Sequence, residues 1–187
     1  MDQALVYIQK REEVSFTLRE IAKDLGVSHT AVYRHFQSKG DLLSSIAEEG
    51  FELLSQRFTE ILERKTSTKT TFRNLGDTYI SFSLDLPQYY RSMFHPELRC
   101  SEGQRTELEY AGGRAFSSLL WILEKGMKEG LFRKTDLMLA GRFVWSSLHG
   151  FSSLQLDGQF ESINSNTTLS AAIDGHLKFT ENALLKS

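Results

Sequence analysis

Apolar residues recur through most of this chain at the three- and four-residue spacing of an amphipathic helix. The clearest run consists of Leu18, Ile21, Ala22 and Leu25. Thr17 and Glu20 have the spacing of a capping box at the start of this run, and Gly26 follows its last apolar residue, where a left-handed glycine often ends a helix. The pattern therefore predicts a short helix between Thr17 and Gly26.

A second short helix is predicted directly after the first. Ser28 is a favourable N-cap for it, and Val32 and Phe36 stand four residues apart as its inward positions. Two short helices joined by a glycine turn have the arrangement of a helix-turn-helix. Leu5 and Ile8 indicate a further short helix ahead of both, which would make this part of the chain a bundle of three helices.

Helical spacing continues to the end of the chain. The later predicted helices run from Ser38 to Ile61, from Phe72 to Leu86, between Pro87 and Pro96, from the loop "ELRCSEGQ" to Gly130, from Thr135 to about Leu156, and from Leu169 to Leu185. The polar tract "ERKTSTKT" is the predicted break after the first of these, and "DGQFESINSNTT" is the predicted loop before the last. Strand-like alternation is almost absent, so we predict an all-α fold.

The composition is that of a globular chain without a strong overall charge. Of the 187 residues 40% are hydrophobic and 25% charged, and the formal net charge is −2, so no general basic field attracts nucleic acid. Cys100 is the only cysteine, which excludes an intrachain disulfide and favours a reducing, cytoplasmic setting. The sequence has no signal-peptide pattern, and no apolar run approaches the roughly 20 residues that span a bilayer, so we expect no membrane contact.

The stretch "LGVSHTAVYRHF" gathers polar side chains on one face of the second short helix. Opposite its inward positions lie His29, Thr30, Tyr33 and Arg34. Near the start of a helix, such side chains can reach base edges in a major groove while their neighbours bond phosphates. The alternative is a solvated polar face on a small bundle. Residues 1–45 carry as many acidic as basic side chains, so any DNA-binding face must be local.

The segment "FTLREIAKDLGVSHTAVYRHFQSKGDLL" resembles the DNA-binding half of TetR-type transcriptional regulators, in its IA-x-x-LGVS start and in its YRHF and SK-x-x-LL groups. The resemblance implies a homodimer whose chains have a helix-turn-helix DNA-binding head over residues 1–45 and a helical ligand-binding and dimerisation body over residues 46–187. By matched position it places base contacts at His29, Thr30 and Arg34 and phosphate contacts at Thr17, Tyr33, His35 and Lys39, and it puts Ser28 in the same DNA-binding set.

A second unusual stretch is "FVWSSLHGF". Trp145 and His149 stand four residues apart and share a helix face, and Gly150 lies mid-helix, where glycine costs about 1 kcal/mol relative to alanine unless a close helix crossing needs it. The W-x-x-x-H-G pattern resembles the C-terminal domain of a TetR branch named for its Trp-His-Gly (WHG) signature. His149 is either a core histidine bonded to a neighbouring polar group or a polar contact inside a ligand cavity.

Aromatic side chains pose the same choice elsewhere in the predicted body. The candidate ligand-binding residues are Tyr79, Phe82, Tyr90, Met93, Phe94, Phe116, Trp145 and His149. Aromatic stripes at helical spacing usually form a core, but pockets in helical bundles are lined by such residues with a few polar groups. The resemblance implies a cavity for a small, mostly apolar effector.

The sequence offers no catalytic constellation. It contains no carboxylate pair, nucleophile elbow, Walker loop or dinucleotide fingerprint, so we expect no enzyme and no cofactor. His95 and Cys100 are too few and too loosely spaced for a zinc site, so we expect no metal, and Cys100 is interpreted as an incidental thiol.

The helix predicted from Thr135 is apolar on two faces. One carries Met138, Gly141, Trp145 and His149, and the other carries Leu137, Ala140, Val144, Leu148 and Phe151. A helix that is apolar nearly all round must be covered on both faces. The second face is therefore predicted to meet its symmetry mate, together with Leu169, Ile173, Leu177, Thr180 and Leu184 of the last helix.

These observations together predict a DNA-binding transcriptional repressor. It would bind a double-stranded DNA operator as a homodimer formed through the last two helices, and a small-molecule effector would release it. The alternative is a helical interaction or ligand-binding protein without DNA binding.

Overall fold

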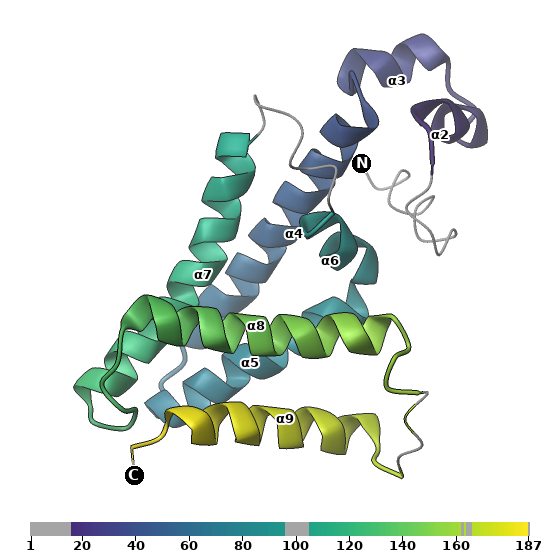
Figure 1. The fold of residues 1–187 in the computed structure, drawn as a ribbon. Coiled ribbons are helices and arrows are strands. Elements are labelled where there is room, and N and C mark those ends of the chain that lie inside the picture. Colours follow the sequence, from purple (N-terminus) through teal and green to yellow (C-terminus); the bar gives the residue numbers. More distant parts are fainter. Residues whose placement is uncertain (1–15, 96–104, 162, 164–165, 187) are drawn as a thin grey trace. The chain divides into compact units, whose positions relative to one another are not determined.

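The chain is described by a computed structural model that covers residues 16–95, 105–161, 163 and 166–186, and this part of the chain forms eight α-helices. They are α2 (Leu18–Asp24), α3 (His29–His35), α4 (Lys39–Leu62), α5 (Thr68–Asp85), α6 (Pro87–Met93), α7 (Arg105–Lys128), α8 (Leu137–Leu156) and α9 (Leu169–Leu184) (Figure 1). The all-α prediction is confirmed, and an isolated bridge between Phe132 and Leu185 is the one β feature in the described ranges. The helix predicted at Leu5 and Ile8, and Cys100, lie outside these ranges.

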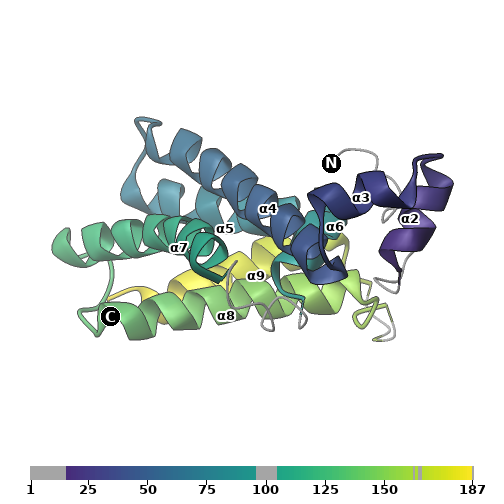
Figure 2. The ribbon, with the colours of Figure 1, turned by 90° about the horizontal axis from the view of Figure 1, so that it is seen from above.

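The helices divide between two compact units. The first consists of residues 1–52 and 88–112, and the second of residues 53–87 and 113–187. In the first unit α2 packs against α3, and both precede the first turns of α4 (Figure 2). No helix in the described part of the chain is long and apolar enough to cross a membrane.

Local hydrogen bonds fix the start of α2 as the sequence predicted. The amide of Glu20 donates to Thr17 Oγ1 at 3.2 Å, and the carboxylate of Glu20 accepts from the Thr17 amide at 2.8 Å, which together form the predicted capping box. Gly26 adopts φ +64° just after α2, a left-handed conformation that glycine takes without steric cost. Ser28 then caps α3, with its Oγ accepting from the amide of Ala31 at 3.2 Å.

The turn from α3 into α4 is closed by a second reciprocal cap. The Asp41 carboxylate accepts from the amides of Gln37 at 2.8 Å and of Ser38 at 3.1 Å, while Ser38 Oγ accepts from the Asp41 amide at 3.1 Å. Leu42 and Ile46 on the following turns are buried. The end of α3 is therefore tied directly to a helix that is anchored in the core of the first unit.

The second unit is built around α5, which packs against both α8 and α9. Helices α8 and α9 run side by side in opposite directions (Figure 1). Gly76 lets α5 lie close to α9, because a Cβ there would lie 2.6 Å from Leu177 Cδ2 of α9. The isolated bridge between Phe132 and Leu185 then fastens the chain after α9 to the connection before α8.

The start of α8 and its closest helix approach differ in detail from the sequence prediction. The helix was predicted from Thr135, whereas its N-cap is Asp136, whose carboxylate accepts from the Leu139 amide at 2.7 Å. The close helix approach is at Gly141, where a Cβ would lie 2.6 Å from Leu120 Cδ2, whereas a Cβ at Gly150 would meet nothing within 4 Å. A buried glycine and an open one have the same sequence pattern, so spacing alone could not separate them.

The predicted dimer face of α8 and α9 was also assigned to the wrong side. Val144 is only 1% exposed, and Leu148, Leu177 and Leu184 are likewise buried within a single chain. The reason is α5, whose own apolar face must be covered and takes the more continuous apolar stripe of each neighbour. The large apolar side chains left exposed on the two helices are Met138, Leu139, Phe143, Leu154, Leu169 and Phe179.

Candidate functional site

The polar side chains predicted to meet DNA all lie on the surface of the first unit. No residue of α3 is buried, and His29, Thr30, Tyr33, Arg34 and His35 are each exposed. The rings of His29 and Tyr33 lie 6.0 Å apart, one helical turn from each other. The exposed face of α3 therefore carries hydroxyl groups, imidazoles and a guanidinium. These groups can donate hydrogen bonds to base edges and phosphates, and a neutral imidazole can also accept one.

Thr17 and Ser28, the N-caps of α2 and α3, differ in whether their hydroxyl proton is already used in a hydrogen bond. Thr17 gives both its amide proton, at 2.8 Å, and its hydroxyl proton, at 3.0 Å, to the Glu20 carboxylate. Thr17 can therefore reach a phosphate only by exchanging that carboxylate for it. Ser28 Oγ accepts from Ala31, so its hydroxyl proton remains for an external acceptor such as a phosphate oxygen.

Lys39 is held at the first residue of α4. Its ammonium lies 5.1 Å from the centre of the ring of Phe16, a buried side chain, in a cation–π contact. The first-turn amides of α4 add their own positive potential at this end of the helix. Charge and backbone therefore both favour an anion beside Lys39, although each alone would be a weak signal.

In the second unit a hydrogen-bonded cluster joins α5, α7 and α8. Trp145 Nε1 donates to the hydroxyl of Tyr79 at 3.2 Å, and that hydroxyl lies 3.3 Å from His149 Nδ1. The ring of Phe116 lies 5.0 Å from that of Trp145 and is inclined to it by 37°. Gly141 makes room for this ring, because a Cβ there would lie 3.0 Å from Phe116 Cζ. The structure thus brings together four of the eight predicted ligand residues.

The other four predicted ligand residues each have neighbours within their own unit. In the first unit, the ring of Phe94 packs against Tyr90, at 5.2 Å, and Phe51, at 5.8 Å. Met93 is buried there, in the space that the absent side chain of Gly50 leaves. In the second unit, Phe82 is fully buried beneath the guanidinium of Arg57, which lies 5.4 Å from the ring centre.

A second polar cluster links α8 to α9 and was not predicted. Ser147 Oγ lies 3.0 Å from His176 Nε2 and 3.1 Å from Thr180 Oγ1, and Thr180 Oγ1 donates to the His176 carbonyl at 2.9 Å. All three bonds form together only when His176 donates to Ser147 and Ser147 donates to Thr180. His176 then has no lone pair aimed at Ser147 and cannot act as its base, so these residues pack two helices together and do not form a catalytic pair.

Burial lowers the pKa of His149 below its ordinary value. It also lowers the pKa of His176, against a smaller opposite effect of the hydrogen bond with Ser147. Both imidazoles therefore bind a proton less readily in the folded chain than in the unfolded chain. The unfolded chain binds protons at these positions first as the pH falls, so acid favours unfolding.

We predict that the free energy of unfolding decreases as the pH falls through about 6.5, the ordinary pKa of histidine. Each of the variants His149→Gln and His176→Gln should make this decrease shallower. Thr30→Ala, which removes an exposed side chain of α3 that has no titratable group, is the control and should leave it unchanged. Denaturant unfolding across this pH range measures the slopes. A slope that is equal in all four proteins would contradict the assignment.

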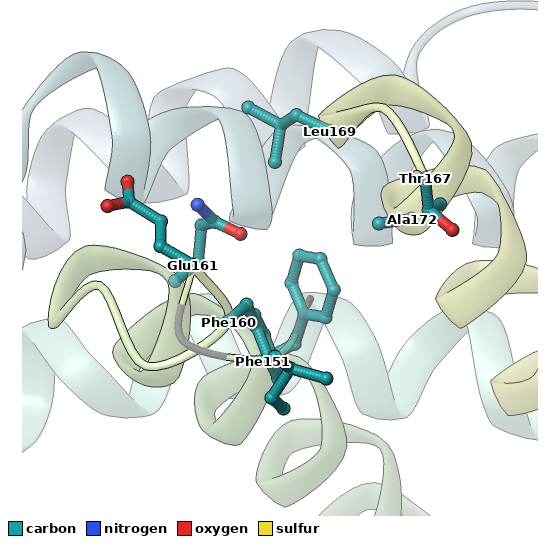
Figure 3. A pocket seen from close by; sticks show the side chains of 8 residues that line it. Phe151, Phe160, Glu161, Thr167, Leu169 and Ala172 are labelled. Atoms are coloured by element: carbon teal, nitrogen blue, oxygen red, sulfur yellow. The ribbon is translucent and has the colours of Figure 1, made fainter. Parts of the chain in front are cut away.

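An open pocket of about 480 Å³, also not predicted, lies where the end of α8 meets the start of α9. Phe151, Phe160, Glu161, Thr167, Leu169 and Ala172 are among the residues that line it (Figure 3). A smaller pocket of about 410 Å³ between α4 and α5 has a polar lining that includes Arg57, Arg64, Glu60 and Asp77. Neither was predicted, because the lining residues come from separate elements and helical spacing does not show which elements meet.

Two family models match the chain. The model described as "Bacterial regulatory proteins, tetR family" matches residues 14–46, and "Tetracyclin repressor-like, C-terminal domain" matches residues 72–175. The chain belongs to the TetR family. It is thus a TetR-family transcriptional regulator with an N-terminal helix-turn-helix for DNA and a C-terminal domain of the ligand-binding type.

The chain is also similar to individual proteins and solved structures. Nucleoid occlusion factor SlmA of Vibrio vulnificus (strain YJ016) is 29% identical over 132 residues, which cover 68% of this chain and 67% of that protein. A protein of unknown function from Rhodococcus sp. RHA1 has a TM-score of 0.81 at 20% identity, over 99% of this chain and 93% of its own. The TetR family regulator PfmR of Thermus thermophilus has a TM-score of 0.75 at 21% identity, over 97% of this chain and 94% of its own. The two structures show that the fold is shared.

The family assignment and the geometry also bear on chemistry. The named relatives are a regulator and a nucleoid occlusion factor, and neither is named as an enzyme. Within the described ranges, no group of three or more His, Cys, Asp or Glu side chains could hold a metal ion.

Proposed function

We propose that this chain is a repressor that binds a DNA operator as a homodimer and leaves the operator when a small, mostly apolar effector binds its body. The observation that carries the proposal is the exposed polar face of α3 within a segment that matches the TetR DNA-binding model. Two such helices in a homodimer would enter major grooves about 34 Å apart, or a multiple of that, on a roughly palindromic operator. Because the chain would act on DNA, the proposal includes a cytoplasmic location.

Base reading is assigned to His29, Thr30 and Arg34. We predict that Arg34→Ala costs roughly 1–3 kcal/mol of binding free energy at one base pair of each half-site and relaxes the preference there. The reason is that a guanidinium can hold two acceptors of a guanine edge at once. Binding to a library of operator variants measures this, with His29→Ala expected to relax a different position. Uniformly weaker binding to every sequence would contradict the assignment.

Phosphate binding is assigned to Tyr33, His35 and Lys39, with Ser28 and Thr17 at the helix starts. We predict that Lys39→Ala weakens binding to every sequence and flattens the plot of log affinity against log salt by about one unit, because one fewer counterion is released. Tyr33→Phe is the control: it should weaken binding to all sequences without changing the slope, since the lost hydroxyl carries no charge. An unchanged slope in Lys39→Ala would remove this lysine from the DNA contacts.

The rival function is a helical interaction or ligand-binding protein whose head does not bind DNA. The equal number of acidic and basic side chains in residues 1–45 favours it. A gel-shift titration with genomic fragments at several salt concentrations separates the two. Salt-dependent binding that selects certain fragments supports the repressor, and its absence at low salt supports the rival.

The effector is assigned to the cluster of Tyr79, Phe116, Trp145 and His149. Support comes from its composition, which combines large apolar rings with a few polar groups, as ligand sites in helical bundles do. Membership of the WHG branch is part of this proposal, and its support is the W-x-x-x-H-G spacing of Trp145, His149 and Gly150. The roles of Phe82, Tyr90, Met93 and Phe94 stay predictions.

A further inference from the structure

The pocket of about 410 Å³ between α4 and α5 is lined by two rows of mostly polar side chains, all within the second unit. One row belongs to α5 and stands at the first, fourth, fifth and eighth positions of a helical stretch, the spacing of a single helix face. The other row lies on the last turns of α4 and in the turn that follows it. The two rows are Asn74, Asp77, Thr78 and Ser81, and Arg57, Glu60, Ile61 and Arg64.

The four charged side chains of this lining differ in whether they already have a partner. The guanidinium of Arg57 lies 3.8 Å from the carboxylate of Asp85, which is outside the lining. Glu60 accepts a long hydrogen bond, of 3.5 Å, from the side chain one turn before it. Within the described ranges, no hydrogen bond or ion pair engages the side chains of Arg64 and Asp77. The pocket therefore offers a ligand one guanidinium and one carboxylate that are not otherwise used.

Neutral polar groups make up most of the remaining lining. Asn74, Thr78 and Ser81 are half-buried, and in the part of the chain that the structure describes no hydrogen bond uses their side chains. The apolar member of the lining is Ile61, which is buried. Half-buried amide and hydroxyl groups are partly withdrawn from water and gain from polar groups on a ligand. Such a lining suits a small polar molecule and does not suit the mostly apolar effector proposed above.

We infer that this pocket binds a small zwitterion of the amino-acid type, with its carboxylate at Arg64 and its ammonium at Asp77. The lining has two arginines and two acidic residues, so a ligand with a single charge would meet repulsion as well as attraction. A molecule with both charges can satisfy both unused groups. A guanidinium holds a carboxylate through two parallel hydrogen bonds, and a carboxylate accepts from an ammonium. The inference adds a second class of ligand and is independent of the proposed effector.

Three probes of one shape separate the two charges. L-Glutamine carries both, and its side-chain amide suits the neutral polar groups of the pocket. L-Glutaminamide has an amide in place of the carboxylate, and glutaramate has a hydrogen in place of the ammonium. In titrations followed by NMR of the protein, we expect L-glutamine to bind about tenfold or more tightly than either analogue, because each analogue leaves one charged group of the pocket without its partner. Equal binding of all three, tighter binding of an analogue, or no saturation by L-glutamine at about 10 mM would overturn the inference.

Two variants assign each charge of the ligand to its partner. Arg64→Gln should abolish the preference for L-glutamine over L-glutaminamide and keep the preference over glutaramate, and Asp77→Asn should do the reverse. Both side chains are exposed, so the variants should fold. Lys65→Gln removes a neighbouring exposed cation outside the lining and should alter neither preference.

The variants also separate this inference from the proposed function. If Arg64→Gln and Asp77→Asn weaken all three probes equally, or if Lys65→Gln acts as Arg64→Gln does, the inference is overturned. Operator binding is tested with substitutions on α3 and α4, and effector binding with Phe116→Ala. Failure of the zwitterion site would therefore leave both of those proposals standing, and their failure would leave the zwitterion site standing.

Discussion

The double substitution Phe143→Asp and Phe179→Asp is expected to convert the proposed homodimer into monomers. Phe143 on α8 is 45% exposed and Phe179 on α9 is 79% exposed, although both belong to well-packed helices. Gly150 stands seven residues after Phe143 and Gly175 four before Phe179, spacings that share a helix face, and a Cβ at either glycine would meet nothing within 4 Å. Small residues beside exposed rings leave room for another pair of helices to approach. A buried charge at the two ring positions would then oppose association.

Loss of the homodimer should also reduce operator affinity by about a hundredfold or more, because the two heads would no longer bind as one linked unit. Light scattering gives the mass, and titration of operator DNA gives the affinity. Thermal unfolding should stay near that of the unaltered protein, since neither ring is part of the core of a single chain. Trp121→Asp is the matched control, because Trp121 is 48% exposed on α7 and outside this face, and it should change neither quantity. A single-chain mass for the unaltered protein would contradict the proposed homodimer.

A charged substitution at Val144 should unfold the chain, whereas the exposed double substitution should only dissociate the homodimer. The comparison therefore distinguishes the two faces of α8. Val144 is 1% exposed and packs within one chain, so Val144→Asp would bury an unpaired charge and unfold the second unit. Loss of the homodimer in that variant would therefore be a consequence of unfolding. An interface variant must be an exposed residue, which the sequence alone did not identify.

The elements that the sequence predicted best are those fixed by neighbouring residues. The cap of Thr17 by Glu20 and the cap of Ala31 by Ser28 each join groups three residues apart, so their spacing is visible in the chain. The left-handed turn at Gly26 is equally local. The proposed DNA-binding face of α3 follows from these caps, because they set where the helix starts and therefore which side chains face outward.

Features that depend on distant partners could not be predicted in the same way. The pairing of Tyr79 with His149 spans 70 residues, and that of Ser147 with His176 spans 29. The periodicity indicated that Trp145 and His149 share a face, but not which side chain from α5 lies against them. It also gave α8 two apolar faces without saying which one α5 covers. Helical spacing determines what lies on a face, and only packing determines what meets it.

The proposed effector should lose about tenfold or more in affinity when Phe116 is replaced by alanine. Its ring packs 5.0 Å from Trp145 and provides a large share of the apolar surface of the cluster, and burial of a phenylalanine side chain contributes about 1.5–3 kcal/mol. Effector-free DNA binding should stay near that of the unaltered protein, because Phe116 is in the second unit and none of the proposed DNA contacts is. Phe160→Ala, in the pocket at the end of α8, is the matched control and should retain effector affinity.

Release from DNA requires more than binding, since an effector shifts a population only by its difference in affinity for two conformations. A change from 1:99 to 99:1 needs about 5.5 kcal/mol, and two sites in a homodimer can share it. Linkage then makes a strict demand: the factor by which the effector lowers operator affinity must equal the factor by which the operator lowers effector affinity. Titrating the effector with and without operator DNA tests this directly. Equal effector affinities in the two titrations would show that the molecule binds without regulating, however tightly it binds, and Phe116→Ala should reduce the binding of a true effector in both.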